Sequence, residues 1–162
     1  MNTIKNMPNT ARVWVYQSNR FFTENEIKEI MFAGENFINQ WSAHGAMLTA
    51  SFDVFHNLFI VLSVDENQAL ASGCSIDKSV HFMKEIENKL AINLFNRLLV
   101  AYRKGDEVMT CNVNQLAEQV TKHFGEGRGE VIVFNNMVTT KAAFDVEWEQ
   151  KLKNSWMKRE LV

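Results

Sequence analysis

Alternation between apolar and polar positions divides the chain into short strands and longer helices. Residues 11–17, ARVWVYQ, are rich in β-branched and aromatic side chains and predict a largely buried strand. Residues 48–55 alternate between apolar and polar side chains and predict a half-buried strand. Residues 58–64, LFIVLSV, are apolar at nearly every position, as in a central strand covered on both faces. We expect a tight turn at His56 and Asn57 between these last two strands.

Two helices are predicted by their apolar spacing. Thr23 opens the sequence TENE, a capping box in which the Thr23 hydroxyl and the Glu26 carboxylate each accept a backbone N–H. The helix that follows has apolar residues three and four positions apart up to Trp41, and we expect Gly45 to end it. The second helix follows the stretch SGCSID, and its apolar stripe consists of Ile76, Val80, Met83, Ile86 and Leu90.

The remainder of the chain carries shorter patterns. Residues 97–103 and 107–111 flank a Lys-Gly-Asp turn and predict a hairpin, and Asn112 can cap a third helix. Residues 130–134, EVIVF, predict a last strand. The spacing of Phe144, Trp148 and Leu152 predicts a tail helix within residues 140–162, and we expect residues 1–10 to be a flexible start.

This order of elements predicts the fold class. The order βαββαβ, followed by a C-terminal β-α-β-α extension, is that of an α+β protein with a ferredoxin-like core. Such a core is an antiparallel sheet with helices on one face. No repeat, linker or low-complexity stretch divides the chain, so we expect residues 1–162 to form a single α+β domain.

Composition and charge narrow the function classes. Hydrophobic residues make up 46% of the chain and charged residues 22%, as in ordinary globular proteins. A formal net charge of −2 creates no long-range field that would attract nucleic acid or anionic lipid, so we do not expect nucleic-acid binding. The first ten residues lack the apolar segment of a secretory signal, and the longest apolar run is far shorter than the roughly 20 residues of a membrane span. We therefore expect a cytoplasmic protein with no membrane span.

Candidate chemistry concentrates in the stretch SGCSID. Ser72, Ser75 and Asp77 can each cap a helix, and Gly73 permits a sharp turn, so a structural cap accounts for these residues. Alternatively, the free N–H groups of the first helical turn, with the Ser72, Ser75 and Ser79 hydroxyls, form a binding site for a small anion. Asp77 argues against a phosphate because its carboxylate already complements the helix dipole.

Cys74 and His44 are the catalytic candidates. A helix N-terminus lowers the pKa of a thiol, so Cys74 could act as a nucleophile if a base such as His44 or His56 lay beside it. His44 precedes Gly45, and a helix C-terminal cap explains it better than a catalytic base does. Lys141, next to two threonines at a helix start, is a further candidate contact for an anion. The spacing of the cysteines and histidines predicts no metal site and no cofactor.

These residues support three functional hypotheses. The leading one is a cytoplasmic binding or accessory domain, not an enzyme, that contacts a small anion or other ligand with residues 72–77. The second is an enzyme with Cys74 as nucleophile and a spatially adjacent histidine as base. The third is a structural protein that binds a protein partner or a second copy of itself.

Four stretches, ARVWVYQSNR, WSAHG, SGCSIDKSVHF and VFNNMVTTKAAF, together with the closing tryptophan, resemble a family of small, functionally uncharacterised bacterial proteins of about this length. The likeness spans nearly the whole chain. Some members are labelled ABC transporter ATPases, an activity that needs a P-loop, G-x-x-x-x-G-K-[ST], after a strand. This sequence has none, since GEGRGE lacks the Lys-Ser/Thr pair and precedes a strand. The resemblance therefore implies kinship but neither a P-loop ATPase nor any assigned catalytic residue.

Overall fold

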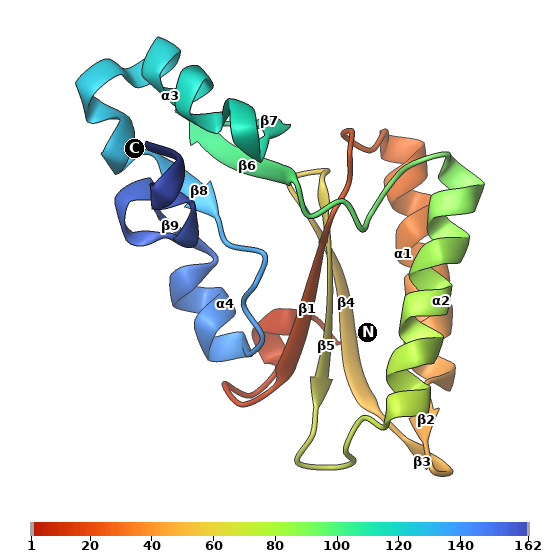
Figure 1. Ribbon diagram of the computed structural model, residues 1–162. Helices are drawn as coiled ribbons and strands as arrows, with labels where there is room; N and C mark the ends of the chain where they lie inside the picture. The colour runs from red at the N-terminus through yellow and green to blue at the C-terminus, as the bar shows by residue number, and fades with distance from the viewer. Residues whose placement is uncertain (1, 162) are drawn as a thin grey trace.

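The computed structural model describes residues 2–161 and arranges their strands in two antiparallel sheets and a small separate hairpin (Figure 1). The first sheet has the order β1-β5-β4, the second the order β7-β6-β8-β9, and β2 and β3 form the hairpin. The strands are β1 (Arg12–Gln17), β2 (Ser42–Ala43), β3 (Ala46–Met47), β4 (Thr49–Phe55), β5 (Phe59–Asp65), β6 (Leu99–Lys104), β7 (Glu107–Asn112), β8 (Ile132–Phe134) and β9 (Glu149–Lys151).

Helices pack on both sides of the first sheet. The α-helices are α1 (Glu24–Gln40), α2 (Gly73–Leu90), α3 (Leu116–Phe124) and α4 (Lys141–Glu147). The 3-10 helices are η1 (Ile4–Asn6), η2 (Val113–Gln115), η3 (Gly125–Glu130), η4 (Leu152–Asn154) and η5 (Trp156–Leu161). In Figure 1, α1 and α2 cover one face of the first sheet, and α4 lies on the opposite side. The prediction of a mixed α+β fold with antiparallel strands is confirmed.

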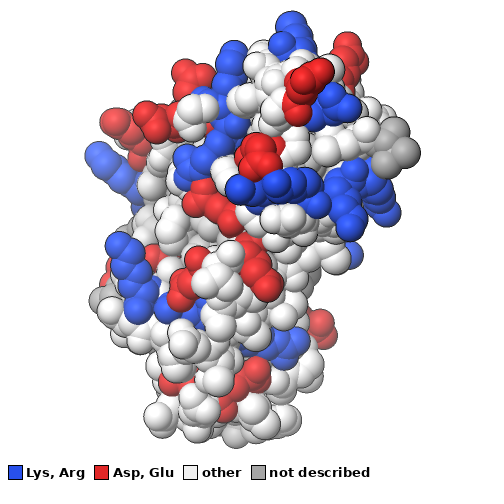
Figure 2. All heavy atoms as spheres, turned by 90° about the vertical axis from the view of Figure 1, so that its left-hand side faces the viewer, with Lys and Arg blue, Asp and Glu red and all other residues white. Residues whose placement is uncertain are grey.

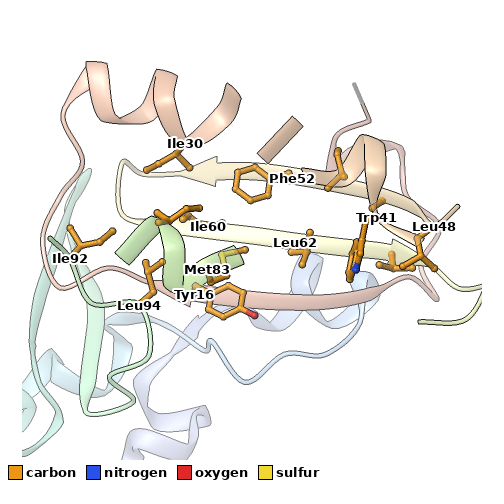
Figure 3. Close-up of a cluster of buried hydrophobic side chains, with 14 of the residues drawn as sticks. Tyr16, Ile30, Trp41, Leu48, Phe52, Ile60, Leu62, Met83, Ile92 and Leu94 are labelled. Carbon is orange, nitrogen blue, oxygen red and sulfur yellow. The ribbon is translucent and has the colours of Figure 1, made fainter. Parts of the chain in front are cut away.

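The central strand β5 is buried on both faces, which explains its continuous apolar sequence. Ile60 and Leu62 belong to the cluster beneath α1 and α2, together with Trp41, Phe52 and Met83 (Figure 3). The alternate β5 residues, Phe59 and Val61, belong to a second cluster on the other face, together with Phe144 of α4 and Trp148, which directly follows α4. Side chains on successive strand residues point to opposite faces, so β5 contributes to both cores.

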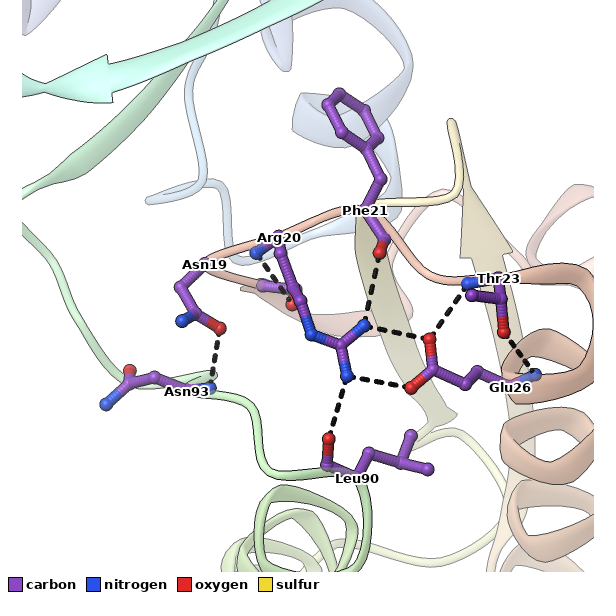
Figure 4. Close-up of polar contacts among 8 residues, drawn as sticks. Asn19, Arg20, Phe21, Thr23, Glu26, Leu90 and Asn93 are labelled. Atoms are coloured by element: carbon purple, nitrogen blue, oxygen red, sulfur yellow. Dashed lines mark hydrogen bonds and ion pairs between the residues drawn. The ribbon is translucent and has the colours of Figure 1, made fainter.

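Helix α1 starts as the sequence predicts. The Thr23 hydroxyl accepts the Glu26 N–H, and the Glu26 carboxylate accepts the Thr23 N–H, which completes the capping box. Arg20 donates to the same Glu26 carboxylate and to the carbonyl of Leu90 at the end of α2, so a single guanidinium links the two helices (Figure 4).

The end of α1 differs from our expectation. The helix ends at Gln40 rather than at Gly45, because Trp41 turns into the core, where its indole N–H donates to the carbonyl of Ser75 at 2.8 Å. His44 and Gly45 form the turn of the β2–β3 hairpin, with φ angles of 51° and 80°. His44 is therefore not a helix cap.

The ferredoxin-like topology is not confirmed. Three of its four strands, β1, β5 and β4, are adjacent in the order that this topology requires, but β6 belongs to the second sheet. A tight turn at Gly105, with φ of 62°, joins β6 to β7, and β6 pairs with β8 on its other side. The backbone groups of β6 are thus hydrogen-bonded by β7 and β8. Residues 139–141 lie along part of the β1 edge where a ferredoxin-like fold would place its fourth strand.

Within residues 2–161, ordered structure extends close to both ends, contrary to our expectation of a flexible start and a tail helix. Ile4 and Met7 are buried, and the Ile4 N–H donates to the Asp53 carboxylate at 2.9 Å. At the other end, α4 extends only from Lys141 to Glu147. The next residues form β9, because Gln150 and its neighbours pair with β8 instead of continuing the helix.

The surface shows no extended patch of one charge on the face that Figure 2 presents. Basic and acidic side chains intermingle in the upper part of that view, and the lower part is largely uncharged. This mixture agrees with the small net charge of −2. Within residues 2–161, none of the helices is both long enough and apolar enough to cross a bilayer.

Candidate functional site

The first turn of α2 is a well-satisfied helix start. Ser72 is the N-cap, and its hydroxyl accepts the Ser75 N–H at 3.1 Å. The Ser75 hydroxyl accepts the Ser72 N–H and donates to the Ser72 carbonyl, and the Ser79 hydroxyl donates to the carbonyl of Ile76. The three hydroxyls that we expected to bind an anion are thus hydrogen-bonded within the helix.

The other candidate ligands of this turn do not converge. Ser75 and Ser79 are buried, whereas Gly73, Cys74 and Asp77 are exposed. Lys141 begins α4, on the other side of the first sheet from α2, and its ammonium pairs with Asp145 at 2.7 Å (Figure 1). The structure therefore does not place Lys141 beside the first turn of α2.

The structure shows no partner base for Cys74. Among residues 2–161, no imidazole is hydrogen-bonded to the exposed Cys74 thiol. His44 is in the β2–β3 turn and His81 pairs with Glu85 at 3.3 Å on the surface of α2. In the same part of the chain, no three His, Cys, Asp or Glu side chains are placed to hold a metal ion.

His56 occupies a contact between the two sheets. It lies in the β4–β5 turn with φ of 53°, stacks on Trp148 with ring centroids 5.9 Å apart, and approaches Arg103 of β6 at 3.4 Å. Burial lowers the pKa of His56, and the positive charge of Arg103 lowers it further. These contacts connect the β4–β5 turn of the first sheet to residues of the second sheet and its neighbouring segment.

A concave site lies beside β1, and we call it the β1 groove. Its volume is about 560 Å³, within the usual range for ligand sites. The walls come from β1, the segment after α2, the start of β6, the segment after β8 and η5. The lining residues are Val13, Trp14, Val15, Tyr16, Gln17, Val80, Leu94, Phe95, Asn96, Arg97, Leu99, Val100, Phe134, Asn136, Met137, Val138, Thr139 and Trp156.

A chain of side-chain hydrogen bonds fixes the orientation of Gln17 in this groove. The Trp148 indole can only donate, and it donates to the Asn136 side-chain oxygen at 3.0 Å. The Asn136 nitrogen is therefore the atom that faces Gln17, and it donates to the Gln17 side-chain oxygen at 2.9 Å. The Gln17 side-chain nitrogen is consequently the free end of this chain.

Two buried donors in the groove walls have no acceptor among the protein's own groups. Within residues 2–161, the buried side-chain polar atoms without a hydrogen-bond partner are Gln17 Nε2 and Trp156 Nε1. Gln17 is only 6% exposed, and both residues line the β1 groove. Buried polar groups in folded proteins are nearly always paired, so two unpaired donors in one groove mark it as a site.

The rest of the groove is apolar with one positive charge. Phe95 and Met137 line it and are 38% and 69% exposed, large values for apolar side chains. Arg97 is the charged residue among the lining residues, and it forms no ion pair within residues 2–161. The groove thus suits a ligand with an apolar body, hydrogen-bond acceptors and no positive charge.

Sequence reasoning missed this site, although it left a signal. Gln17 ends an apolar strand, and a glutamine in such a strand needs partners when it is buried. Asn136 lies between the strand predicted at residues 130–134 and the predicted tail helix, and Trp156 lies in the tail. Only the fold brings these three residues, from distant parts of the chain, to one groove.

Comparisons with known proteins identify no relative. No protein-family model matches the chain, and neither curated proteins nor solved structures include a significant match.

Proposed function

We propose that this protein is a non-catalytic binding domain whose ligand occupies the β1 groove. The observation that carries the proposal is the pair of unpartnered buried donors, Gln17 Nε2 and Trp156 Nε1, in the walls of one groove. Leaving a buried donor unpaired costs about 1–3 kcal/mol. A ligand with two acceptor atoms removes both costs at once.

The chemistry of the walls defines the ligand class. An apolar body would lie against Trp14, Phe95 and Val138, and carbonyl or carboxylate oxygens would accept from Gln17 and Trp156. Arg97 favours a neutral or anionic ligand over a cation. Both donor atoms are covered in the free protein, so binding requires each of them to become accessible from the groove.

The β1 groove replaces the first turn of α2 as the proposed site. The Ser75 and Ser79 hydroxyls donate within the helix, so of the three hydroxyls only that of Ser72, which accepts the Ser75 N–H, keeps a proton to donate to an anion. Catalysis by Cys74 and assembly with a second copy stay hypotheses that no contact in the structure favours.

N-methylacetamide, a small soluble analogue of the peptide bond with one carbonyl acceptor, tests the proposal. We would titrate it into uniformly ¹⁵N-labelled protein and follow the side-chain N–H signals by NMR. We expect saturable shifts for the Trp156 indole and the Gln17 amide. Trp41 and Trp148 are controls in the same sample, because their indole N–H groups already donate to Ser75 and Asn136.

The variant Trp156→Phe is the matched control, because it removes one free donor and keeps an aromatic ring. In this variant we expect weaker shifts at Gln17. Equal shifts at all indoles, or no saturation at Gln17 and Trp156, would contradict the proposal.

A further inference from the structure

We infer that the ligand of the β1 groove is an extended peptide segment of another protein, which adds to the free edge of β1. This inference rests on the proposed function and specifies its ligand. The central observation is that the backbone groups along the first half of the free β1 edge are hydrogen-bonded, whereas those along the second half are not.

Residues of the protein itself already pair with the first half of that edge. The Val13 N–H donates to the Thr139 carbonyl at 2.9 Å, and the Ala11 carbonyl accepts the Lys141 N–H at 2.9 Å. Arg12 and Thr140 form an antiparallel bridge. A short segment therefore already uses β1 as an edge for antiparallel pairing.

The second half of the edge has no neighbouring strand. Residues of an antiparallel strand alternate between the two sides, so Val15 and Gln17 direct their backbone groups away from β5, as Val13 does. Within residues 2–161, the N–H groups of Val15 and Gln17 have no hydrogen-bond acceptor. Such a row of free groups is a template for an added strand.

The segment that could have completed the pairing forms a turn instead. The Met137 N–H donates to the Asn135 side-chain oxygen at 3.1 Å, and the Val138 N–H donates to the Asn135 carbonyl at 3.4 Å. These bonds hold residues 135–138 in a turn, and the β1 groove lies between this turn and the edge of β1.

An extended peptide would both accept hydrogen bonds from the free donors of the groove and fill the space between its walls. Its carbonyls would accept from the Val15 N–H and from the Gln17 and Trp156 side chains. Its side chains would alternate between the wall that contains Tyr16 and Phe95 and the wall that contains Phe134 and Val138, and both walls are apolar. Arg97 then pairs with an acidic residue or a terminal carboxylate of the peptide.

A second copy of this chain fits the site less well than a flexible segment. The edge of β1 lies within a groove lined by residues 94–97 and 136–139. Two copies that paired through β1 would bring these flanking segments of each copy against the other. A single extended chain meets no such obstacle.

A random heptapeptide library displayed on phage, panned on the immobilised full chain, provides the test. We expect enrichment of β-branched and aromatic sequences that carry an acidic residue. The enriched peptides would then be synthesised, and their dissociation constants measured for the wild type, Val15→Pro and Val15→Thr. Proline removes the edge N–H without removing a bond to β5, and threonine keeps the N–H.

We expect Val15→Pro to weaken binding at least tenfold and Val15→Thr to change it less than about threefold. Arg97→Gln should weaken binding several-fold, only for peptides that contain the acid. Thermal melts of both Val15 variants verify that they fold. If Val15→Pro does not fold, single N-methylation along the peptide gives the answer on the wild type, because loss of binding at every second position indicates strand pairing.

Each outcome separates this inference from the proposed function. Shifts of Gln17 and Trp156 with N-methylacetamide, but no enriched peptide or equal affinity of Val15→Pro, would overturn the peptide and leave a small-molecule groove. No response in either experiment would overturn both. A dimer of the wild type that Val15→Pro abolishes would overturn the choice of a foreign peptide in favour of a second copy.

Discussion

The Asn136 side-chain nitrogen donates to the Gln17 side-chain oxygen at 2.9 Å, although the two residues are 119 positions apart. This bond joins the segment after β8 to the end of β1. It also requires Gln17 to present its nitrogen, rather than its oxygen, as the group without a partner. The polarity of the β1 groove thus depends on Trp148, which fixes the orientation of Asn136.

Two tryptophans should respond differently to replacement by phenylalanine. Trp148→Phe removes the hydrogen bond from the Trp148 indole to the Asn136 side-chain oxygen. We expect this variant to lower the free energy of unfolding by about 1–3 kcal/mol. Trp156→Phe removes a buried donor that has no partner, so we expect the free energy of unfolding to stay equal or to rise. Urea denaturation measures both. Equal losses in the two variants would show that the Trp156 N–H is satisfied in the free protein.

Gly34→Ala should destabilise the protein although alanine favours helices. A Cβ atom at Gly34 of α1 would overlap the Phe52 ring of β4, which is fully buried and has no space to move into. Overpacking of this kind costs about 1–3 kcal/mol, and alanine recovers roughly 1 kcal/mol of helix propensity. We expect a net loss in urea denaturation. The loss should shrink in a Phe52→Leu background, and an equal loss there would exclude this contact as its cause.

His56 should make stability decline on the acid side of neutrality. Its pKa in the folded protein is lowered from the ordinary value of 6.5, mainly by burial. As pH falls below about 6.5, the unfolded chain therefore binds a proton that the folded protein resists, and the free energy of unfolding decreases. His56→Asn removes this dependence and tolerates the positive φ. Unfolding measured between pH 7.5 and 5.5 should show a shallower slope in the variant, and an unchanged slope would refute the assignment.

Glu26 should contribute to acid unfolding at lower pH. Hydrogen bonds from Arg20 and from the Thr23 N–H lower its pKa from 4.5 to about 2. A depressed carboxyl pKa stabilises the folded state above the unfolded value, so this contribution is lost as pH falls from about 4.5 towards about 2. Glu26→Gln should flatten the pH dependence of the melting temperature in that window. Glu24→Gln in the same helical turn is the control, and an equal effect there would contradict the role of the Arg20 contact.

The two cysteines should differ in alkylation. Cys74 is exposed, whereas Cys111 is half-buried and burial raises its pKa to about 11. Because the thiolate is the reactive form, iodoacetamide at pH 8 should modify Cys74 at least tenfold faster than Cys111, as intact mass and peptide mapping would show. A titration of the Cys74 rate against pH also tests the enzyme hypothesis, since a midpoint far below about 8.5 would revive a catalytic role.

Local sequence determined those elements whose helix caps or apolar patterns involve only a few neighbouring residues. The capping box at Thr23, the apolar β5 and the start of α2 at Ser72 follow from side chains that satisfy neighbouring backbone groups or alternate along a strand. The length of a helix was less predictable. Helix α1 stops at Gln40, five positions before the expected glycine, because burial of Trp41 outweighs the continued helical pattern.

Only the tertiary structure decided the sheet to which β6 belongs and the location of the candidate site. The residues of β6 could pair with more than one strand distant in the sequence, and the local sequence does not distinguish these partners. The sequence therefore could not predict that β6 pairs with β8 rather than with β1. The same holds for Gln17, which is an ordinary strand residue in the sequence. Its buried nitrogen is left without a partner because Asn136, 119 positions away in the chain, donates to its oxygen, and Trp148 fixes the orientation of Asn136.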